Sequence, residues 1–395
     1  MHDVLVVGGG PGGLYAATLL ARDGFDTVVL EEHETVGQPV HCTGVLAAEA
    51  FDEFDVPRDA ILNSLSTARF HSPAGLSVSY TTPSTEAVVI DRALFDRGIH
   101  DRAIAAGVCV RFGARVGALE ITPNGVVAST ANAIVRARVC VIACGANYTL
   151  QRRLGFGMPS VFLRSAQLEM KAGRTGDVEV YFGRDVAPKG FAWVVPVRRE
   201  TGTFARVGLM SESDPSGYFR RFLGRVRAEW ELSEPDDGDL APRQKMLPLA
   251  PVECTHADRV LLVGDAAGLV KATTGGGIYY SLVSASLAAK VLAPALRRNA
   301  LHASRLRQYE TLWRKRLAAE FDAQLALRNA AQQMDDEDID GMFDLARTNG
   351  VMPIIRRTAR FNRHRDLIAA LFKHPPARRL LLKELASRVA AIPAR

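Results

Sequence analysis

The chain has 395 residues, of which 48% are hydrophobic and 23% charged, and its formal net charge is +6. This length is sufficient for two or three domains, and the composition is that of an ordinary soluble globular protein. No uncharged apolar run reaches the roughly 18 residues that a membrane span requires. The closest run, 275–289, ends at Lys290. The sequence therefore argues against an integral membrane protein.

The chain begins with a predicted buried strand, a glycine-rich turn and a helix, at 4–7, 8–13 and 14–22. Gly8, Gly10 and Gly13 have the spacing G-x-G-x-x-G of dinucleotide-binding turns. The first glycine permits the tight turn, the second lets backbone approach a pyrophosphate, and the third lets the helix pack closely on the strand. We expect the diphosphate to bind free N–H groups at the helix start, with Pro11 of the same turn also contacting the cofactor.

A second predicted strand, 27–30, ends at Glu31, which lies 18 residues after Gly13. A carboxylate at this position accepts hydrogen bonds from ribose hydroxyls and repels a 2′-phosphate. The two strands, the turn and the acidic residue together predict a site for an adenine dinucleotide.

The next part of the chain is predicted to return to this first domain. A loop rich in helix breakers, 37–45, is followed by half-exposed strands at 68–90. A helix at 93–106, which ends at Gly107, and further strands at 108–127 and 134–143 come next. From 161 to about 252 the pattern is rich in strands, which predicts an antiparallel sheet covering the first domain. Residues 297–395 are predicted to be helical, with breaks near 350–353 and 374–376.

A second cofactor signal follows the apolar strand at 259–263. Asp265, after Gly264, could bind the ribityl hydroxyls of a flavin. The loop that follows contains Gly275, Gly276, Gly277 and Ile278 and leads into a long helix. The N–H groups and the dipole of this helix could stabilise negative charge on a reduced isoalloxazine. An NAD-dependent dehydrogenase does not need this second site. The two motifs, in this order, predict FAD.

With these residues in view, the chain resembles the flavoprotein monooxygenase-like group and, within it, the geranylgeranyl reductase family. The family loop P-V-x-C-x-G matches 39–44, its P-x-x-Y-x-W-x-F-P signature matches 188–196, its flavin loop matches 264–280, and its segment containing Asp91 and Arg92 matches 90–96. The resemblance adds Cys42 and Arg92 to the expected FAD-binding residues.

The resemblance implies an α/β fold with a glutathione-reductase-type, Rossmann-like FAD-binding domain, an inserted antiparallel β-sheet substrate domain and a helical C-terminal region. We assign 1–70, 88–160 and 255–296 to the FAD-binding domain. We assign 71–87 and 161–254 to the substrate-binding domain, and 297–395 to the basic helical region.

The resemblance also implies reduction of isolated C=C bonds in a prenyl chain on a lipid, quinone or terpenoid, by hydride from reduced flavin N5 and a proton from an acid. An isolated alkene has no carbonyl to polarise, so catalysis depends on positioning and on excluding water. Phe191, Trp193 and Val195, with Tyr279, are the expected substrate-pocket residues. Cys42 is the candidate proton donor or positioning group, and its neighbour His41 could tune the thiol.

Three departures from the related families concern the electron donor and the substrate. Cys144-Gly145 replaces an Asp-Gly pair that contacts FAD and the nicotinamide donor in related hydroxylases. Lys271-Ala272 replaces an Asn-Pro beside the flavin ring, so Lys271 either tunes the flavin or points to solvent. Phe191 lacks the hydroxyl of the family tyrosine. NAD(P)H and a ferredoxin-like protein both remain open as electron donors.

Two alternative functions remain beside the reductase. An FAD monooxygenase or halogenase acting on an aromatic or polyketide would fit the cofactor, but 191–196 lacks the first tryptophan of the halogenase W-x-W-x-I-P motif. An FAD-containing nucleic-acid-binding protein would use the basic C-terminal region. Few aromatics, such as Phe361 and Phe372, are present there for base stacking, so we expect no nucleic acid partner.

The remaining predictions concern metals and cellular location. The five cysteines form no CxxC pair and no zinc spacing, so no metal site is expected: Cys42, Cys109, Cys140, Cys144 and Cys254. Residues 354–395 contain 11 Lys and Arg against 2 Asp and Glu. With the apolar segments 367–372 and 380–382, they form either a surface for anionic membranes or solvated helix faces with a buried stripe. The glycine motif begins almost at Met1, so we expect no signal peptide and a cytoplasmic protein, free or peripheral on the inner membrane face.

Overall fold

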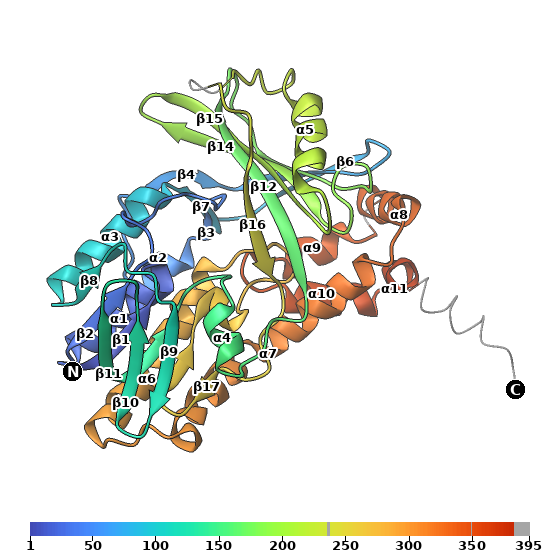
Figure 1. Ribbon diagram of the computed structural model, residues 1–395. Helices are drawn as coiled ribbons and strands as arrows, with labels where there is room; N and C mark the ends of the chain where they lie inside the picture. Colours follow the sequence, from blue (N-terminus) through green and yellow to red (C-terminus); the bar gives the residue numbers. More distant parts are fainter. Residues whose placement is uncertain (235–237, 349, 383–395) are drawn as a thin grey trace, which may run out of the picture.

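A largely parallel sheet forms the lower lobe of the computed structural model, which describes residues 1–234, 238–348 and 350–382 (Figure 1). Its parallel strands lie in the order β8 (Cys109–Arg111), β2 (Thr27–Leu30), β1 (His2–Val7), β11 (Ile134–Ile142) and β18 (Val260–Leu262). Antiparallel neighbours extend it: β17 (His256–Ala257) pairs with β18, and the hairpin of β9 (Ala118–Thr122) and β10 (Gly125–Ser129) pairs with β11. All residues of β2 and β18 are buried, as expected for strands covered on both faces.

Helices α1, α3, α6 and α7 pack together with this sheet. α1 (Pro11–Arg22) contacts both α3 (Arg92–Ala105) and α6 (Ile278–Arg297), and α6 contacts α7 (Ala303–Ala331). α3 begins at Asp91, whose side chain accepts a hydrogen bond from the backbone N–H of Leu94. This capping bond fixes where the helix starts, directly after a strand that ends at Ile90.

In the part of the chain that the structure describes, α6 is the one helix long and apolar enough to cross a membrane by length and composition. Of its most apolar 18-residue window, 67% is buried inside the protein. Leu282, Val283 and Leu292 belong to the same hydrophobic cluster as β1 and α1. α6 is therefore a core helix of the lower lobe.

A seven-stranded sheet forms the upper lobe (Figure 1). Its strand order is β16 (Arg243–Pro248), β12 (Phe162–Lys171), β15 (Gly202–Ser211), β14 (Phe191–Arg199), β13 (Val178–Tyr181), β5 (Thr67–His71) and β6 (Ser77–Thr81). Neighbouring strands are antiparallel except β5 and β13, which are parallel.

The two faces of the upper sheet bury different side chains. Along β14, Ala192 and Val194 pack under α5 (Pro215–Val226), whereas Trp193 and Val195 belong to a cluster on the opposite face. This alternation follows from the period of two residues in a strand. One face of the sheet is thus covered by α5, and the other faces the lower lobe.

A small sheet of β3 (Val45–Ala47), β7 (Ala87–Ile90) and β4 (Ile61–Leu65) connects the lobes, with the short helix α2 (Glu49–Glu53) after β3. β3 and β7 are antiparallel, with Val45 opposite Val89. The backbone N–H of Ile90 also donates to the Gly44 carbonyl over 2.8 Å. The segment before β3 and the segment after β7 are therefore held together at one end of the sheet.

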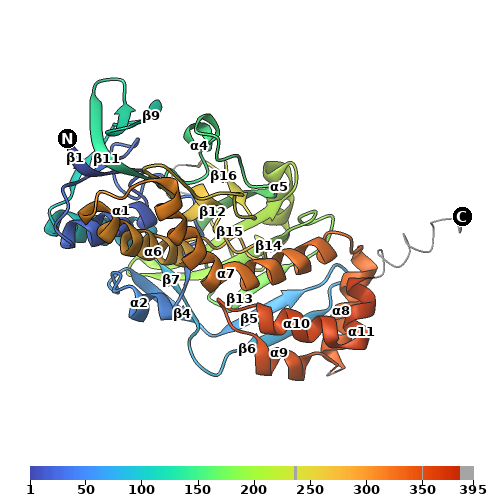
Figure 2. The same ribbon diagram turned by 90° about the horizontal axis from the view of Figure 1, so that it is seen from below.

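The C-terminal region consists of helices that follow the long helix α7, namely α8 (Asp336–Arg347), α9 (Met352–Thr358), α10 (Arg365–Lys373) and α11 (Pro375–Leu381). α7 runs from the lower lobe to these helices, which lie together at the far end of the molecule (Figure 2). α10 buries Ile368 and Leu371, and Leu371 packs with Leu381 of α11 in a cluster that reaches β6. As far as residue 382, the apolar side chains of this region thus form the buried stripe that was one of the two expectations. Residues 383–395 lie outside the described residues.

The predicted fold class is confirmed, with differences in detail. The parallel pair β5 and β13 corrects the expectation of an antiparallel sheet throughout. β5 begins at Thr67, within the range 1–70 assigned to the FAD-binding domain, and the domain boundaries remain a prediction. Helix α5 was missed, although Phe219, Phe222 and Val226 show helical spacing after a capping Asp214.

Candidate functional site

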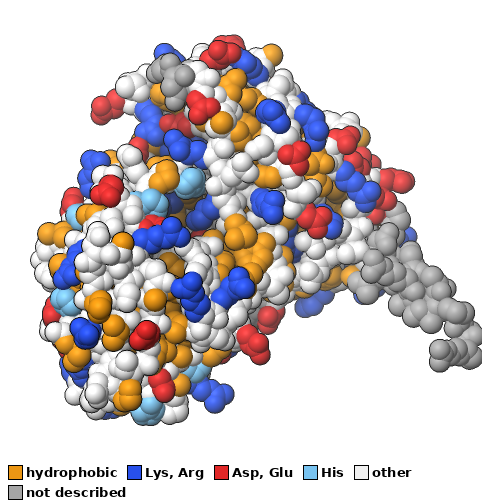
Figure 3. All heavy atoms as spheres, in the orientation of Figure 1, with side chains coloured by type: hydrophobic (Ala, Val, Ile, Leu, Met, Phe, Trp, Pro, Cys, Tyr) orange, Lys and Arg blue, Asp and Glu red, His pale blue; other side chains and the backbone are white. Residues whose placement is uncertain are grey.

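A cavity of about 1410 Å³ lies where the two lobes and the C-terminal region meet. Pockets for one drug-sized ligand are typically about 300–1,000 Å³, so this cavity has room for a dinucleotide and a second ligand. Basic side chains that line it include Arg92, Arg153 and Lys245. Lys, Arg and His side chains gather where the lobes meet in the space-filling view (Figure 3).

The glycine turn between β1 and α1 forms one wall of the cavity. Gly8 has φ +107°, and a Cβ there would collide with the Ala143 carbonyl. A Cβ at Gly13 would collide with the Gly8 carbonyl oxygen, which shows how closely α1 packs on the turn. A Cβ at Gly10 would meet no atom within 4 Å. Gly8 and Gly13 are thus required by packing, whereas Gly10 leaves open space beside the start of α1.

Glu31 lies at the carboxyl end of β2, beside the same turn. Its side chain is buried, and Oε2 accepts a hydrogen bond from the Gly9 N–H while Oε1 accepts one from the His33 N–H over 3.0 Å. Among the described residues no side chain caps the first turn of α1, which begins at Pro11. The arrangement therefore offers a fixed carboxylate and an uncapped helix start on one cavity wall, where a ribose and a diphosphate could bind.

Asp265 lies across the cavity, in the short 3-10 helix η1 (Gly264–Ala267) that follows β18. Its Oδ2 accepts a hydrogen bond from Lys245 Nζ over 3.1 Å, and this carboxylate raises the pKa of Lys245. A Cβ at Gly277 would lie 2.6 Å from Asp265 Oδ1. The glycine loop before α6 therefore passes directly against this carboxylate.

Cys42 and Arg92 are brought together by the pairing of β3 with β7. Gly44 donates its N–H to Cys42 Sγ over 3.3 Å, and the Arg92 guanidinium lies beside the same sulfur. Arg92 also forms a two-bond ion pair with Asp96, at 2.8 and 3.1 Å. Burial alone would lower the pKa of Arg92, but the Asp96 carboxylate and the sulfur raise it. The cavity thus presents a thiol next to a permanent cation.

Side chains of the upper sheet hold the cysteine loop in place. Arg206, which is 4% exposed, donates to the carbonyls of Thr43 and Ile90, and the Thr43 hydroxyl donates to Gln167 over 2.8 Å. His41 lies in the same loop and has a buried Nδ1 with no partner among the described residues. Burial, together with Lys245 and Arg243, lowers the pKa of His41.

An apolar wall faces the cavity from the upper sheet. Phe191 and Trp193, with ring centroids 5.7 Å apart, line it together with Val195. Trp193 lies opposite Gly208 of β15, where a Cβ would be only 2.6 Å from the indole. The Trp193 ring therefore occupies the space that a side chain at Gly208 would fill, and it forms part of the cavity wall.

The C-terminal region supplies a further wall that the sequence did not predict. Lys271 is 3% exposed, so it does not point to solvent; its Nζ donates to the Phe361 carbonyl over 3.0 Å and lies 4.1 Å from the centre of the Phe361 ring. Burial lowers the pKa of Lys271 to about 7. His364 hydrogen-bonds Thr273 over 2.8 Å, and burial beside Lys271 lowers the pKa of this histidine to about 4. These contacts fix the segment between α9 and α10 against the flavin loop.

The structure places most of the predicted site residues on this cavity. Those that line it are Gly8, Gly10, Pro11, Gly13, Glu31, Cys42, Arg92, Phe191, Trp193, Val195, Gly264, Asp265, Gly275, Gly276, Gly277 and Ile278. Tyr279 is a correction, because it lies outside the cavity lining. Its hydroxyl donates to Glu53 over 2.7 Å, and its ring packs on Phe54, so the first turn of α6 directs it into the core.

Comparison with known proteins agrees with this geometry. The model of a family described as an FAD binding domain matches residues 1–322. The chain belongs to this FAD-binding family. The predicted cofactor is thereby confirmed, and the flavoprotein is an FAD-dependent oxidoreductase.

The flavoprotein is also similar to curated proteins of archaea. It is 28% identical to the digeranylgeranylglycerophospholipid reductase of Methanocaldococcus jannaschii, over 87% of this chain and 90% of that one. It is 28% identical to digeranylgeranylglycerophospholipid reductase 2 of Methanothermobacter thermautotrophicus, over 86% of this chain and 90% of that one. The predicted resemblance to geranylgeranyl reductases is confirmed.

Solved structures show the same fold. A geranylgeranyl bacteriochlorophyll reductase-like protein from Thermoplasma acidophilum superposes with a TM-score of 0.83 at 23% identity, covering 98% of each chain. The halogenase PltM, solved with FAD, superposes with a TM-score of 0.69 at 16% identity, covering 98% of this chain and 96% of that one. At these identities the likeness shows the fold alone.

Sequence reasoning missed three groups of cavity residues in the flavoprotein. Lys245 follows no motif and reaches Asp265 from an edge strand. Arg328 comes from α7, and Phe361 and His364 come from the segment between α9 and α10; the position of these elements cannot be inferred from their own periodicity. Gln167 lines the cavity but carried no usable signal, because strand 162–171 also contains Arg164 and Glu169. Arg206, which holds the cysteine loop without lining the cavity, did carry one, since a charged residue within the apolar segment 204–210 indicates a specific buried contact.

Proposed function

We propose that this flavoprotein reduces isolated C=C bonds of a prenyl chain carried by a lipid or a related terpenoid. The observation that carries this proposal is that one cavity holds both the cofactor motifs and a continuous apolar wall of the upper sheet. A prenyl chain has no polar group to bind, so it requires such a wall. The names of the archaeal reductases support the same substrate class.

The residues that we assign to the cofactor fit FAD along its length. Gly8, Gly10 and Gly13 with Pro11 would receive the diphosphate, and Glu31 the adenosine ribose. Gly264, Asp265, the loop 275–277 and Ile278, at the start of α6, would hold the flavin end, next to Arg92 and Cys42. Bound FAD supplies, in its reduced form, the hydride that adds to one alkene carbon.

The side chains of this protein then have two tasks. Phe191, Trp193 and Val195 position the alkene and exclude water, because nothing in an isolated double bond can be polarised. The Cys42 thiol, held by Gly44 and the anchored loop, gives a proton to the second alkene carbon. Arg92 beside the sulfur stabilises the thiolate that remains.

The electron donor, the membrane contact and the location are finer parts of the same proposal. Either NAD(P)H binding transiently or a ferredoxin-like protein would reduce the flavin. The basic C-terminal region would draw a cytoplasmic enzyme to an anionic membrane surface by charge, since the apolar faces of α10 and α11 are packed inside the protein.

An anaerobic experiment tests the reductase. The flavin is photoreduced without oxygen, a geranylgeranyl lipid is added, and flavin reoxidation is followed by absorbance. We expect reoxidation with the unsaturated lipid and none with its fully saturated phytanyl counterpart. The flavin of a monooxygenase or halogenase, the alternative that uses the same cofactor, would instead be reoxidised only by oxygen.

A further inference from the structure

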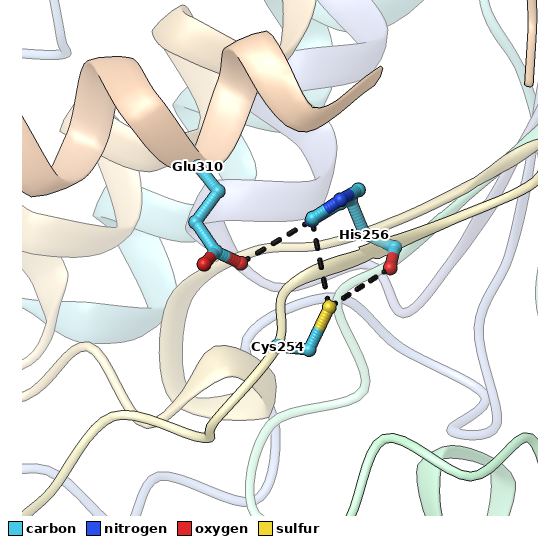
Figure 4. Close-up of side chains that lie close together, drawn as sticks. All are labelled: Cys254, His256 and Glu310. Carbon is cyan, nitrogen blue, oxygen red and sulfur yellow. Dashed lines mark hydrogen bonds and ion pairs between the residues drawn. The ribbon is translucent and has the colours of Figure 1, made fainter. Parts of the chain in front are cut away.

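Three potential metal ligands meet beside β18 of the lower lobe, outside the cavity lining. Cys254, His256 and Glu310 come from the end of a loop, from β17 and from α7, and their side chains converge (Figure 4). The ligand atoms Sγ, Nδ1 and a carboxylate oxygen lie within 4.8 Å of one another. None of the three residues lines the cavity.

The backbone explains why these residues meet. Cys254 and His256 are two positions apart in an extended segment, so their side chains project to the same side. α7 packs across this segment, and Glu310 lies on the face of α7 that meets β17. The juxtaposition therefore depends on the tertiary contact between β17 and α7.

The distances fit tetrahedral coordination. His256 Nδ1 lies 3.5 Å from Cys254 Sγ and 3.3 Å from Glu310 Oε2. Zinc binds thiolate sulfur at about 2.3 Å and imidazole nitrogen or carboxylate oxygen at about 2.0–2.2 Å, so tetrahedral ligand-to-ligand edges are about 3.3–3.6 Å. The separation of Nδ1 from Oε2 is long for a hydrogen bond, that of Nδ1 from Sγ is ordinary for one to sulfur, and both match these edges.

Within the cluster His256 Nδ1 has two partners, Cys254 Sγ at 3.5 Å and Glu310 Oε2 at 3.3 Å, and both are engaged elsewhere. Cys254 Sγ donates to the His256 carbonyl over 3.1 Å, so its proton does not serve Nδ1. Glu310 Oε2 already accepts from the N–H and the hydroxyl of Thr255, at 2.9 and 3.1 Å. A cation at the centre would satisfy Nδ1, Sγ and Oε2 together, while the Thr255 N–H would still orient the carboxylate.

We propose that Cys254, His256 and Glu310 bind a zinc ion, with water as the fourth ligand. Binding forms Zn–S, Zn–N and Zn–O bonds and releases the thiol proton of Cys254 to solvent. His256 and Glu310 have side chains 13% and 17% exposed, which leaves an approach for the ion and the water. The ion would join β17 and the loop before it to α7, and so fasten α7 to the sheet whose strand β18 leads to Asp265.

The surroundings support a rigid site of moderate charge. Trp313 donates its indole N–H to the Thr255 hydroxyl over 2.9 Å, which fixes the residue between the two loop ligands. Arg314 donates to Glu310 Oε1 over 2.9 Å, so only Oε2 is directed to the cluster. One thiolate and one carboxylate neutralise a divalent ion, and the guanidinium holds the carboxylate in its ligating orientation.

Cobalt(II) titration of the FAD-loaded, full-length protein tests the site, because tetrahedral cobalt shows d–d bands at longer wavelengths than the flavin absorption. Zinc content after anaerobic dialysis gives a second measurement. We expect one ion per chain, a higher Tm with zinc, and at least a tenfold weaker affinity in both Cys254→Ser and Glu310→Gln. Cys109→Ser, at an exposed cysteine, should behave as wild type.

Two outcomes would overturn the proposal. One is a protein that retains no zinc and gives no tetrahedral cobalt spectrum. The other is metal binding that Cys254→Ser and Glu310→Gln leave unchanged. Glu310→Gln keeps a hydrogen-bond acceptor for Thr255, so it remains informative if the cysteine variant does not fold, and FAD content verifies the fold of each variant.

Discussion

Gly10 and Gly13 of the cofactor turn should respond differently to an added methyl group. In Gly13→Ala the new Cβ collides with the Gly8 carbonyl and lies 3.1 Å from the Ala143 Cβ, so α1 must move away from the turn. Overpacking of this kind costs about 1–3 kcal/mol. Since ~1 kcal/mol corresponds to roughly 2–4 °C in a domain of 150–250 residues, we expect Tm to fall by several degrees and FAD affinity to fall with it.

In Gly10→Ala the methyl group meets no protein atom within 4 Å, and the backbone, with φ −75° and ψ 175°, suits alanine. We therefore expect Tm of the apoprotein to change by no more than about 2 °C, since only a helix-cap preference is lost. The methyl group would stand where the diphosphate approaches the N–H groups of α1. Loss of one charge-assisted hydrogen bond, about 1.5–3 kcal/mol, raises the Kd for FAD by roughly 10–100-fold.

Apoprotein reconstituted with FAD gives both quantities, Kd from quenching of flavin fluorescence and Tm from calorimetry. Gly224→Ala, in α5, is the matched control, because its Cβ also meets nothing within 4 Å and lies far from the cavity. Wild-type FAD affinity in Gly10→Ala would refute the assignment of this turn to the diphosphate. An unchanged Tm in Gly13→Ala would refute the packing argument.

Further predictions concern the lysine, the thiol and the apolar wall. Burial lowers the pKa of Lys271 from 10.5 to about 7, so between these pH values the unfolded chain binds more protons and wild-type stability rises with pH. Lys271→Met should raise the free energy of unfolding of the apoprotein at pH 7 by at most about 5 kcal/mol, and should raise its Tm accordingly. A Tm difference between variant and wild type that does not shrink towards pH 10 would contradict this. Cys42→Ala should retain FAD but slow alkene reduction, measured in single turnovers, by about 10²–10⁴-fold. A rate within threefold of wild type, which corresponds to a barrier change on the order of thermal energy, would remove the thiol from the mechanism. Trp193→Phe should raise KM for a prenyl lipid about tenfold with unchanged FAD content, and an equal KM would show that the chain lies elsewhere.

The cofactor half of the site was predictable because its signals are local. The glycine turn, Glu31 and Asp265 each follow a recognisable strand, and parallel strands bring their carboxyl ends to one edge of a sheet. The prediction for Tyr279 failed because the phase of a helix in its first turn depends on what it packs against, here Phe54 and Glu53. Sequence periodicity does not determine that phase.

The C-terminal wall could not be predicted because its contacts join distant segments. The contact of Lys271 with Phe361 depends on how α7 returns the chain to the flavin loop, and no motif marks either residue. The same holds for His256 and Glu310, which are brought together by packing of α7 on β17 and show no zinc spacing in the sequence. Such sites become visible only when the helices are placed.

Single-turnover product analysis tests the central claim most directly. The photoreduced protein is mixed without oxygen with a stoichiometric amount of a digeranylgeranyl glycerophospholipid, and the lipid is examined by mass spectrometry. The account predicts one saturated double bond, heavier by two hydrogen atoms, for each flavin oxidised. A lipid recovered unchanged while the flavin stays reduced, with reoxidation only on admission of oxygen, would contradict it.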